Sequence, residues 1–405
     1  MAKPIRVLMI VRLFYPWVGG MERQAHKLAK SLIKRGVAVE ISTGWWFRGT
    51  PQHEQIDGIP VTRNTTLWEF FGIKGLRKFG GYLYIVSLLW HLWRKRNEYD
   101  LIHIHGLNYH TFAAVLAGKW FGRGTLTKLA NSGQASDIDK MRQNKKLMFT
   151  QQMLPMALES DRFIAINKDI VNELKAAGVP HQKIIKLTNG VEVEEIVAKE
   201  DYTLGSPIRI VFVGRLHEQK GVDTLLNAFQ LLLESYAQRS LSLQLIGDGP
   251  LRNELVTLAE RLGVMPHVDF VGLSDQVMAY LHQADLFVLP SRAEGISNAL
   301  LEAMACALPV VVSQIPGNTD VVEHEKNGLL VPPDDAEALA ASMASLLERH
   351  DLRKSLGTNA RQVVNERYSL DSVADQYISL YHEMLSRQSG SHQPSLIGTN
   401  EVHNV

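Results

Sequence analysis

Two parts of this chain repeat one pattern, in which an apolar segment is followed by a loop with glycine and a helix with one apolar face. In the first half, an apolar segment at 5–11 precedes a predicted helix at 21–35. In the second half, an apolar segment at 208–213 precedes a predicted helix at 222–236. Strands that alternate with helices at this spacing form parallel βαβ units, so the pattern predicts an α/β protein.

The same alternation continues through both halves. Further buried strands are predicted at 37–42, 101–105, 162–166, 242–246, 268–272 and 285–289. We therefore expect two doubly wound, Rossmann-like domains that face a cleft, joined near 198–207. Ligands of such sheets bind beyond the carboxyl ends of the strands. The polar residues at the end of the chain predict a disordered tail at 387–405.

The composition is that of a globular protein. Of the 405 residues, 45% are hydrophobic and 21% are charged, which excludes a disordered chain, a coiled coil and a collagen. The net charge of +1 gives no support for a nucleic-acid partner. The single cysteine, Cys306, cannot form an internal disulfide, which favours a reducing compartment.

No segment has the pattern of a signal peptide or a membrane span. The apolar run at 7–11 is ended by Arg12 and is too short for a signal peptide. The longest apolar stretch, at 82–93, contains His91 and is too short to cross a bilayer. We expect a cytoplasmic protein that is either free or attached to the inner face of the membrane.

The charges are divided unevenly between the two halves. Residues 1–200 carry a net charge of +12 and residues 201–405 carry −11, which fits either different partners or mere divergence in composition. Within 67–96, eight aromatic and six basic residues accompany one acid. One interpretation of this segment is a surface for anionic membranes, and the other is a core helix with solvated basic residues.

A basic loop follows the strand at 208–213. This loop, at 214–221, has the sequence GRLHEQKG and leads into a helix. Arg215 and Lys220 therefore lie at the carboxyl end of a strand and beside a helix N-terminus, where anions bind. Two fixed positive charges suit a diphosphate. A solvated basic loop is the alternative, because the spacing fits neither GxGxxG nor a P-loop.

A second candidate loop follows the strand at 285–289. Gly295 lets the backbone approach a ligand closely, and Ser297 or Asn298 can cap the helix that follows. The free amides in the first turn of that helix can bind a phosphate or a sugar hydroxyl.

Two glutamates flank the start of this helix. Glu294 precedes the helix and Glu302 lies inside it, so the two suit separate hydroxyl-accepting roles better than an acid–base pair. The alternative for Glu302 is a helix position that faces solvent.

Taken together, these segments resemble the retaining GT-B glycosyltransferases, in particular the large family 4 of bacterial polysaccharide and glycolipid glycosyltransferases (group 1). The resemblance spans about residues 5–385 and rests on segments in the same order. These are 19–22, 189–192, 214–221, 247–250, the pair Glu294 and Glu302, and 327–331. It implies an acceptor-side domain at 1–200, a nucleotide-sugar donor domain at 206–367 and a helix at 368–386 that returns to the first domain.

The resemblance also implies roles for residues of the second half. Arg215 and Lys220 would hold the donor diphosphate and neutralise the charge of the leaving group. Glu302 would accept the ribose hydroxyls, and Glu294 would contact the hydroxyls of the donor sugar. The backbone expected to help Glu294 is that of Gly295, Ile296, Ser297 and Asn298.

Further roles fall on both halves. Gly19 and Gly20 would let the first loop close over the phosphates, and the backbone at Gly272 would contact the base. His105 would approach the donor sugar as a catalytic residue. His103 points to the same side of its strand, but only the terminal histidine is expected to reach the cleft.

Two features depart from the family or from its relatives. Glu192 stands where the family often has aspartate, which keeps the charge. Asp137 and Asp139 match the DxD motif of one-domain, metal-dependent glycosyltransferases, but they lie in a polar stretch and are interpreted as a loop and helix cap. We therefore expect no metal and no cofactor.

The resemblance implies a retaining transfer of a sugar from a nucleotide-diphosphate donor, a UDP-sugar, to a hydroxyl. The acceptor expected is a lipid-linked or polysaccharide glycan in cell-envelope or exopolysaccharide biosynthesis. Two alternatives remain open, an epimerase of the same fold that acts on UDP-sugars and an inactive nucleotide-sugar-binding subunit. The presence of four charged side chains argues against the inactive subunit, and these are Arg215, Lys220, Glu294 and Glu302.

Overall fold

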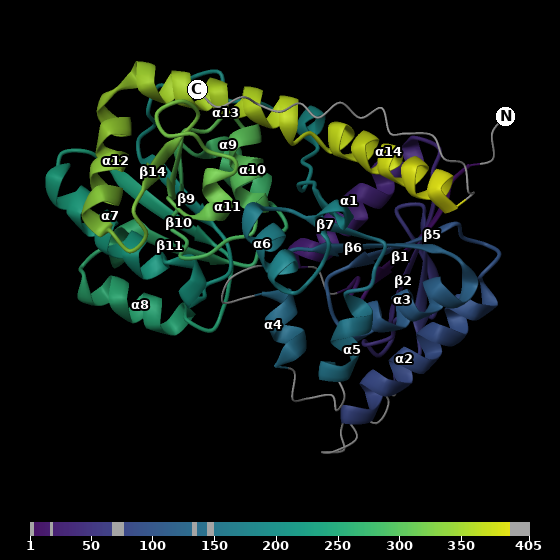
Figure 1. Cartoon of the computed structure of the whole chain (residues 1–405). Helices are drawn as coiled ribbons and strands as arrows, with labels where there is room; N and C mark the ends of the chain where they lie inside the picture. Colours follow the sequence, from purple (N-terminus) through teal and green to yellow (C-terminus); the bar gives the residue numbers. More distant parts are fainter. Residues whose placement is uncertain (1–3, 17–18, 67–76, 132–135, 144–149, 389–405) are drawn as a thin grey trace.

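The protein folds into two α/β domains that lie side by side (Figure 1). The computed structural model describes residues 4–16, 19–66, 77–131, 136–143 and 150–388. Each domain is built on one mainly parallel sheet whose helices pack against it. The predicted α/β fold with two doubly wound, Rossmann-like domains is confirmed.

The first sheet has the strand order β3-β4-β2-β1-β5-β6-β7-β8, and all of its pairs are parallel except β3 with β4. Its strands are β1 (Arg6–Val11), β2 (Ala38–Gly44), β3 (His53–Ile56), β4 (Ile59–Asn64), β5 (Leu101–His105), β6 (Gly124–Leu129), β7 (Arg162–Ala165) and β8 (Ile184–Lys186). The chain builds outward from β1 in one direction and from β5 in the other. The carboxyl ends of β1 and β5 are therefore a switch point, where ligands of such sheets bind.

The second sheet has the order β11-β10-β9-β12-β13-β14 and is parallel throughout. Its strands are β9 (Ile208–Val213), β10 (Leu241–Ile246), β11 (Val268–Gly272), β12 (Leu286–Leu289), β13 (Val310–Ser313) and β14 (Leu329–Val331). Its switch point lies between β9 and β12. The loops predicted to bind the donor follow these two strands.

Helices cover both sheets. Those before the second sheet are α1 (Gly20–Lys34), α2 (Arg77–Arg94), α3 (Tyr109–Phe121), α4 (Asp137–Arg142), α5 (Thr150–Ala157) and α6 (Lys168–Ala176). The others are α7 (Val222–Ser235), α8 (Arg252–Arg261), α9 (Val277–Gln283), α10 (Asn298–Ala305), α11 (Pro316–Thr319), α12 (Ala336–Glu348), α13 (His350–Arg367) and α14 (Leu370–Gln388). Within the described ranges, none of these helices is both long and apolar enough to span a membrane.

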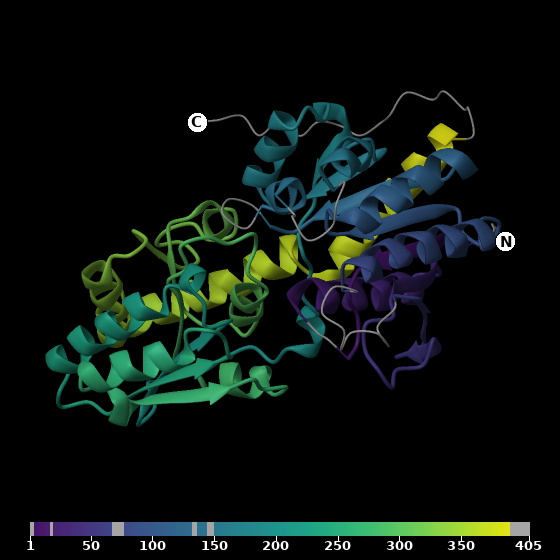
Figure 2. The same cartoon turned by 90° about the horizontal axis from the view of Figure 1, so that it is seen from below.

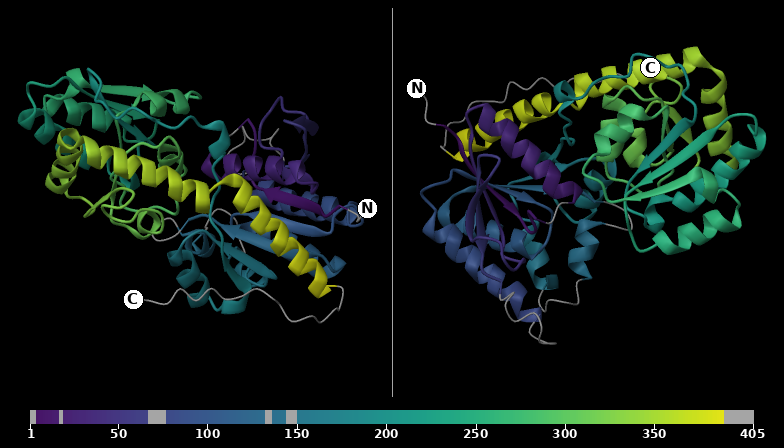
Figure 3. Two further views of the ribbon diagram at one scale, coloured as in Figure 1. Left: turned by 90° about the horizontal axis from the view of Figure 1, so that it is seen from above. Right: turned by 180° about the vertical axis from the view of Figure 1, so that it is seen from behind.

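The last helix, α14, leaves the second domain and lies along the first (Figures 2 and 3). Its buried residues Tyr377, Leu380 and Tyr381 pack with α1 and with β1 in one hydrophobic core. The Tyr381 hydroxyl and His103 Nδ1 form a buried hydrogen bond of 2.8 Å. His103 therefore has a structural role, as expected, because it joins β5 to α14.

The end of this helix corrects one prediction. Arg387 and Gln388 were expected in the disordered tail, but they belong to α14, where Arg387 pairs with Glu383 at 2.9 Å, one turn earlier. The rest of the predicted tail, 389–405, lies outside the described residues. The domain limits at 1–200, 206–367 and 368–386 remain predictions.

The contact between α14 and β5 yields a prediction about stability. Tyr381→Ala should lower the free energy of unfolding of the first domain by about 3–5 kcal/mol, because it removes a fully buried ring. Tyr381→Phe should cost less, because only the hydrogen bond to His103 is lost. Tryptophan fluorescence during urea unfolding reports this domain, since all seven tryptophans lie in the first 120 residues.

Ser379→Ala is the control, because Ser379 is exposed on the same helix. An unchanged urea midpoint for Tyr381→Ala would show that α14 does not stabilise the first domain.

Candidate functional site

Two loops of the second domain, one between β9 and α7 and the other between β12 and α10, are held together. Gln219 Nε2 donates a hydrogen bond of 2.7 Å to the carbonyl of Ala293. Gly221 has a φ of +62°, and a Cβ there would lie 2.2 Å from the carbonyl oxygen of Pro290. Only glycine fits at this contact, so the position fixes the two loops against each other.

The contact brings two predicted site residues together from positions 74 residues apart. Lys220 Nζ forms an ion pair with Glu294 Oε1, and the same oxygen accepts a hydrogen bond of 2.7 Å from Ser291 Oγ. The Glu294 side chain is only 8% exposed and Lys220 is 18% exposed. Arg215, in contrast, is exposed and forms no ion pair within the described part of the chain. The Arg215 guanidinium is therefore available to an anion from solvent.

The start of α10 also lies where it was predicted to act. Ser297 Oγ accepts a hydrogen bond from Leu300 N at 3.4 Å, which confirms Ser297 as the N-cap. Ile296 is buried beside it. Gly295 touches the first domain, because a Cβ there would lie 2.6 Å from the carbonyl oxygen of Ala130. The free amides of α10 thus begin directly beside the end of β6.

Asn298 connects the two domains through its side chain. Its Oδ1 accepts hydrogen bonds from Gln24 Nε2 at 3.1 Å and from Asn189 Nδ2 at 3.0 Å. Its Nδ2 donates to the carbonyl of Gly20 at 3.4 Å. Gly20 stands at the end of the loop after β1, and a Cβ there would lie 3.3 Å from Asn298 Nδ2. The switch points of the two sheets therefore meet at Asn298.

Glu302 lies deeper in α10 and does not face solvent, so the alternative of a solvated helix position is wrong. Lys27 of α1 lies 3.7 Å from Glu302 and 3.3 Å from Glu192, and so pairs with one acid of the second domain and with one acid of the connection between the domains. Burial raises the pKa of Glu302 above 4.5, while the positive charges of Lys27 and Arg23 oppose that rise.

His105 is buried at the carboxyl end of β5. Its ring stacks on His103 with 4.4 Å between centroids, and neither of its nitrogens has a hydrogen-bond partner among the described residues. Burial lowers the pKa of His105 well below 6.5, so the ring is neutral. Lys128 of β6 lies beside His105 in register, and burial lowers its pKa to about 8. A neutral histidine and a buried lysine thus share this end of the sheet.

The two remaining glycines of the predicted site occupy separate places. Gly19 donates its amide to Glu22 Oε2 at 3.0 Å, at the start of α1. Gly272 ends β11 with a φ of +79° and accepts a hydrogen bond from Gly247 N at 2.8 Å. The next residue, Leu273, is 84% exposed and offers an apolar surface beside that turn. Gly19 thus lies at the first switch point and Gly272 at the edge of the second sheet.

The Asp137–Asp139 pair has structural partners. The Asp137 carboxylate is buried and accepts hydrogen bonds from the amides of Ala130 and Asn131 at 3.0 and 3.3 Å. Asp139 pairs with Arg142 at 3.1 Å in the same helix. Both aspartates lie in the first turn of α4, whose N-cap is Ser136, so the interpretation of this motif as a loop and helix cap is wrong. Their contacts nevertheless give both residues a structural role. No group of three or more His, Cys, Asp or Glu side chains within the described ranges is arranged to hold a metal ion.

Comparison with known families agrees with this geometry. The model for glycosyl transferases group 1 matches residues 196–363, and the model for glycosyltransferase family 4 matches residues 18–195. The chain belongs to the family 4 and group 1 glycosyltransferases. The matched ranges together span the first sheet apart from β1, the whole second sheet and the two loops at the second switch point.

Two curated relatives align with this glycosyltransferase over nearly their whole length. One is the N-acetyl-alpha-D-glucosaminyl L-malate synthase of Bacillus anthracis, 26% identical over 92% of this chain and 96% of the relative. The other is the O-antigen chain mannosyltransferase C of Escherichia coli, 25% identical over 95% of this chain and 100% of the relative. Among solved structures, HepE of Anabaena in complex with UDP-glucose superposes with a TM-score of 0.73 at 18% identity, covering 94% and 100% of the two chains. That likeness concerns the fold.

Sequence reasoning missed residues of this glycosyltransferase that meet the site from the first domain. Gln24 and Lys27 lie one turn apart on α1, and only the placement of the domains reveals their partners Asn298 and Glu302. Lys128 did carry a signal, because it is a lysine near the end of an otherwise uncharged buried strand. A charge at such a position is rarely structural without a partner.

Because Arg215 is exposed, replacing it is the cleaner test of whether Arg215 and Lys220 bind the donor diphosphate. Arg215→Ala should lower turnover on the order of 10²–10³-fold through loss of a group that stabilises the leaving anion. The melting temperature should not change, because the side chain is exposed. Lys220→Ala should lower turnover similarly and also reduce stability, since it leaves Glu294 buried without its partner.

Steady-state kinetics with a nucleotide-sugar donor measures both variants against Arg261→Ala, which changes an exposed arginine elsewhere in the same domain. Turnover of Arg215→Ala close to that of the unmodified protein would refute the assignment.

The ion pair of Lys27 makes a prediction about pH. If ionised Glu302 accepts ribose hydroxyls, affinity for UDP should fall as the pH drops through the raised pKa of Glu302. Lys27→Met removes a charge that lowers this pKa, so the acidic limb of the affinity profile should move to higher pH. Calorimetric titration of UDP across pH gives the profile. Lys34→Met, on the exposed end of α1, should leave it in place, and an unshifted limb in Lys27→Met would contradict the role of Glu302.

Proposed function

We propose that this glycosyltransferase transfers a sugar from a UDP-sugar to a hydroxyl with retention of configuration at the anomeric carbon. The acceptor that we propose is a lipid-linked or polysaccharide glycan of the cell envelope or exopolysaccharide. The names of the relatives support this class, since one is an O-antigen chain mannosyltransferase and a structural neighbour was solved with UDP-glucose.

One observation carries the proposal. Lys220 contacts Glu294, which precedes the free amides at the start of α10, and Arg215 is exposed in the same loop as Lys220. Both loops lie at the switch point of the second sheet. Positive groups at such a position suit a diphosphate, whose negative charge grows as the bond to the sugar breaks. Lys220 and Ser291 both contact Glu294 Oε1. The other carboxylate oxygen, Oε2, takes no part in these two contacts and can accept a hydrogen bond from a hydroxyl of the sugar.

The same arrangement fits retention of the anomeric configuration by a mechanism that has no covalent intermediate between sugar and enzyme. Glu294 is held by an ion pair and a hydrogen bond, and Asp137 is engaged by backbone amides, so neither is poised as a nucleophile. The acceptor hydroxyl then attacks from the face that the diphosphate leaves, and a donor phosphate oxygen takes its proton. Catalysis of this kind depends on orientation and on stabilisation of the leaving group.

Neutral His105 has a place in this scheme. A neutral imidazole can accept a hydrogen bond from a sugar hydroxyl or donate one to it. It adds no positive charge beside the one that develops on the sugar. His105 ends β5 at the switch point of the first sheet. The loop after it packs on Met21 of α1, since a Cβ at Gly106 would lie 3.2 Å from Met21 Sδ. We assign His105 to contact with the donor sugar.

The proposal makes a prediction about transfer chemistry. The protein should transfer sugar from a UDP-sugar with the same anomeric configuration in donor and product, and excess EDTA should not stop it, because Arg215, Lys220 and helix amides supply the positive charge. Donors are found by thermal shift, since only ligands of the folded state raise the melting temperature. NMR of the product gives the configuration.

Four outcomes would contradict parts of this proposal. Inversion would contradict the mechanism, and loss of activity in EDTA that only Mn²⁺ or Mg²⁺ restores would contradict metal independence. Conversion of the UDP-sugar to an epimer without an acceptor would favour the epimerase alternative, and donor binding without any turnover would favour the inactive subunit.

The first domain has an exposed apolar face on α2. Tyr84, Leu88 and Leu92 are buried on the inner side of this helix. The outer side carries Val86, Trp90 and Trp93, which are 62%, 60% and 45% exposed, and we call these three residues the aromatic face. The two interpretations of the segment at 67–96 therefore describe opposite sides of one helix. The part of that segment at 67–76 lies outside the described residues.

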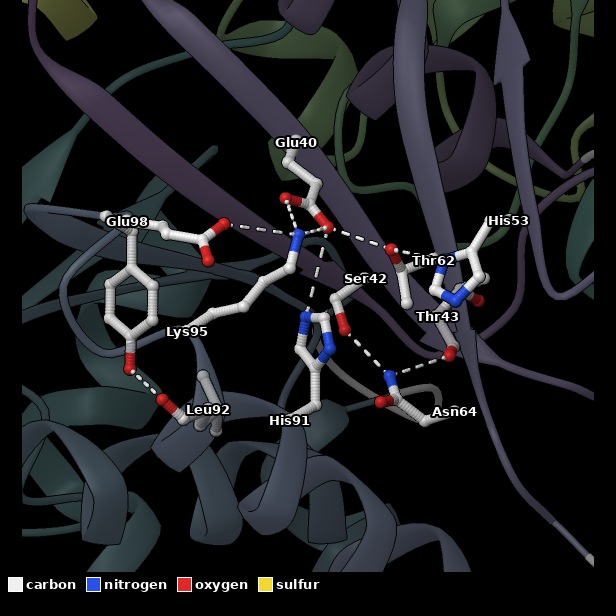
Figure 4. Close-up of polar contacts among 11 residues, drawn as sticks. Glu40, Ser42, Thr43, His53, Thr62, Asn64, His91, Leu92, Lys95 and Glu98 are labelled. Atoms are coloured by element: carbon white, nitrogen blue, oxygen red, sulfur yellow. Dashed lines mark hydrogen bonds and ion pairs between the residues drawn. The ribbon is translucent and has the colours of Figure 1, made fainter.

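The inner side of α2 is fixed by a polar cluster as well as by packing (Figure 4). Lys95, just after α2, donates to both oxygens of Glu40 on β2, at 2.8 and 2.6 Å. His91 lies 3.9 Å from the same carboxylate, and Thr62 Oγ1 donates to it at 2.8 Å. Because these contacts hold the helix against the sheet, its outer side keeps one orientation.

We propose that the aromatic face docks on an anionic membrane, which would bring a lipid-linked acceptor to the first domain. Exposed tryptophans favour the headgroup region, and Arg94 and Arg96 beside them favour anionic lipids. The protein should therefore sediment with vesicles that contain phosphatidylglycerol, less so at high salt. Replacing Trp90 and Trp93 together by serine should abolish sedimentation without unfolding, since both side chains are exposed.

Val197→Ser is the control for the vesicle experiment, because Val197 is an exposed apolar residue far from α2 in the sequence. Retention of the protein in the supernatant at low salt, whatever the lipid, would refute membrane docking and favour a soluble acceptor.

A further inference from the structure

A second site lies at the opposite end of the first sheet from the donor loops. A pocket of about 500 Å³ opens at the amino ends of β6 and β7, between the end of α3 and the end of α14. Gly124 and Arg162, which begin the two strands, are part of its wall. No role in sugar transfer falls on this end of the sheet, because ligands of doubly wound sheets bind at the carboxyl ends.

The pocket is strongly basic. Its lining has two acidic residues, Glu159 and Asp161, and five basic ones, which are Lys119, Arg123, Arg162, Lys183 and Arg387. Three of the cations have carboxylate partners, because Lys119 pairs with Glu159 while Arg162 and Arg387 share the single carboxylate of Glu383 at 3.1 and 2.9 Å.

Two cations of the pocket have no carboxylate partner among the described residues. Arg123 donates only to the carbonyl of Arg96, at 3.0 and 2.7 Å, and Lys183 donates to the carbonyl of Ser160 at 3.1 Å. The nearby carboxylate of Asp161 is engaged by the amide and hydroxyl of Thr125, at 2.8 and 3.0 Å. Both cations are partly buried, so their charge is less screened than on an open surface.

The pocket is continuous with the aromatic face. The guanidinium of Arg96 lies 5.1 Å from the centre of the Trp93 ring, and the backbone carbonyl of Arg96 holds Arg123 in the pocket wall. On the other side, Lys119 of the pocket is followed by Trp120, which is 62% exposed at the end of α3. A membrane that receives the tryptophans therefore lies beside the mouth of the pocket.

We propose that this pocket binds the terminal phosphate of an anionic lipid headgroup. The proposal rests on the membrane docking argued above and names the lipid chemistry that it selects. A phosphomonoester carries more charge than a diester and has no second ester group on the outer side of its phosphate, so the phosphate can enter a recess lined by a guanidinium and an ammonium group. In a diester the second ester group covers the phosphate on that side, so the phosphate meets only the outer basic residues.

Vesicle sedimentation tests the selectivity. Phosphatidylcholine vesicles are doped with phosphatidic acid, a monoester, or with phosphatidylglycerol, a diester, and the two sets are matched in surface charge. The unmodified protein should prefer phosphatidic acid on the order of tenfold, the contribution of a charge-assisted hydrogen bond. Arg123→Gln and Lys183→Gln should each lose this preference and keep binding to phosphatidylglycerol. Lys354→Gln, at an exposed lysine of the second domain, should keep it.

The outcomes separate this site from membrane docking itself. Equal binding to both vesicles, or a preference that survives in both pocket variants, overturns the headgroup site and leaves docking intact. Binding to neither vesicle overturns both proposals. Titration with glycerol 3-phosphate tests whether the ligand of the pocket is a soluble phosphate. If this compound binds tightly through Arg123 and Lys183 and the protein shows no preference between the vesicles, the pocket is assigned to a soluble phosphate. That result overturns the lipid assignment. Lys183→Gln is informative even if Arg123→Gln unfolds, since Lys183 is the last residue of a single-turn 3-10 helix (His181–Lys183) before β8 and is only partly buried.

Discussion

The hydrogen bonds of the Asn298 side chain are the contact on which the rest of the site depends. They link the first residue of α10 to Gln24 and Gly20 in the first domain and to Asn189 in the connection between the domains. Each sheet alone offers only one half of a site at the carboxyl ends of its strands. Because Asn298 holds the two ends together, the free amides of α10, the basic loop after β9 and the end of β5 surround one region, and a donor bound there would contact both domains.

Electrostatics reinforces this arrangement and explains the uneven charge of the sequence. The basic first domain meets the acidic second domain through Lys27 with Glu302, and through Lys186 with Asp320 at 3.0 Å. Part of the net charge of each half is therefore cancelled where the domains meet. The surplus of positive charge that remains on the first domain includes the pocket between α3 and α14 and the residues beside the aromatic face, where an anionic surface would balance it.

Much of the fold followed from local patterns. The strands at 101–105, 208–213 and 268–272 have the predicted limits, because buried parallel strands are continuous apolar segments with polar or glycine residues at their ends. The two loops that we propose to bind the donor were recognisable, since each follows such a strand. The contacts of Lys27 with Glu302 and of Gln24 with Asn298 were not, because they join residues more than 270 positions apart and depend on how the domains are placed. The basic pocket was hidden for the same reason, since its cations come from four separate segments.

A crystal structure with bound UDP would test the central claim most directly, that residues from both switch points form one donor site. The account predicts the diphosphate between Arg215, Lys220 and the first amides of α10, with the ribose hydroxyls at Glu302. A diphosphate bound away from these groups, or a ribose that does not touch Glu302, would contradict it.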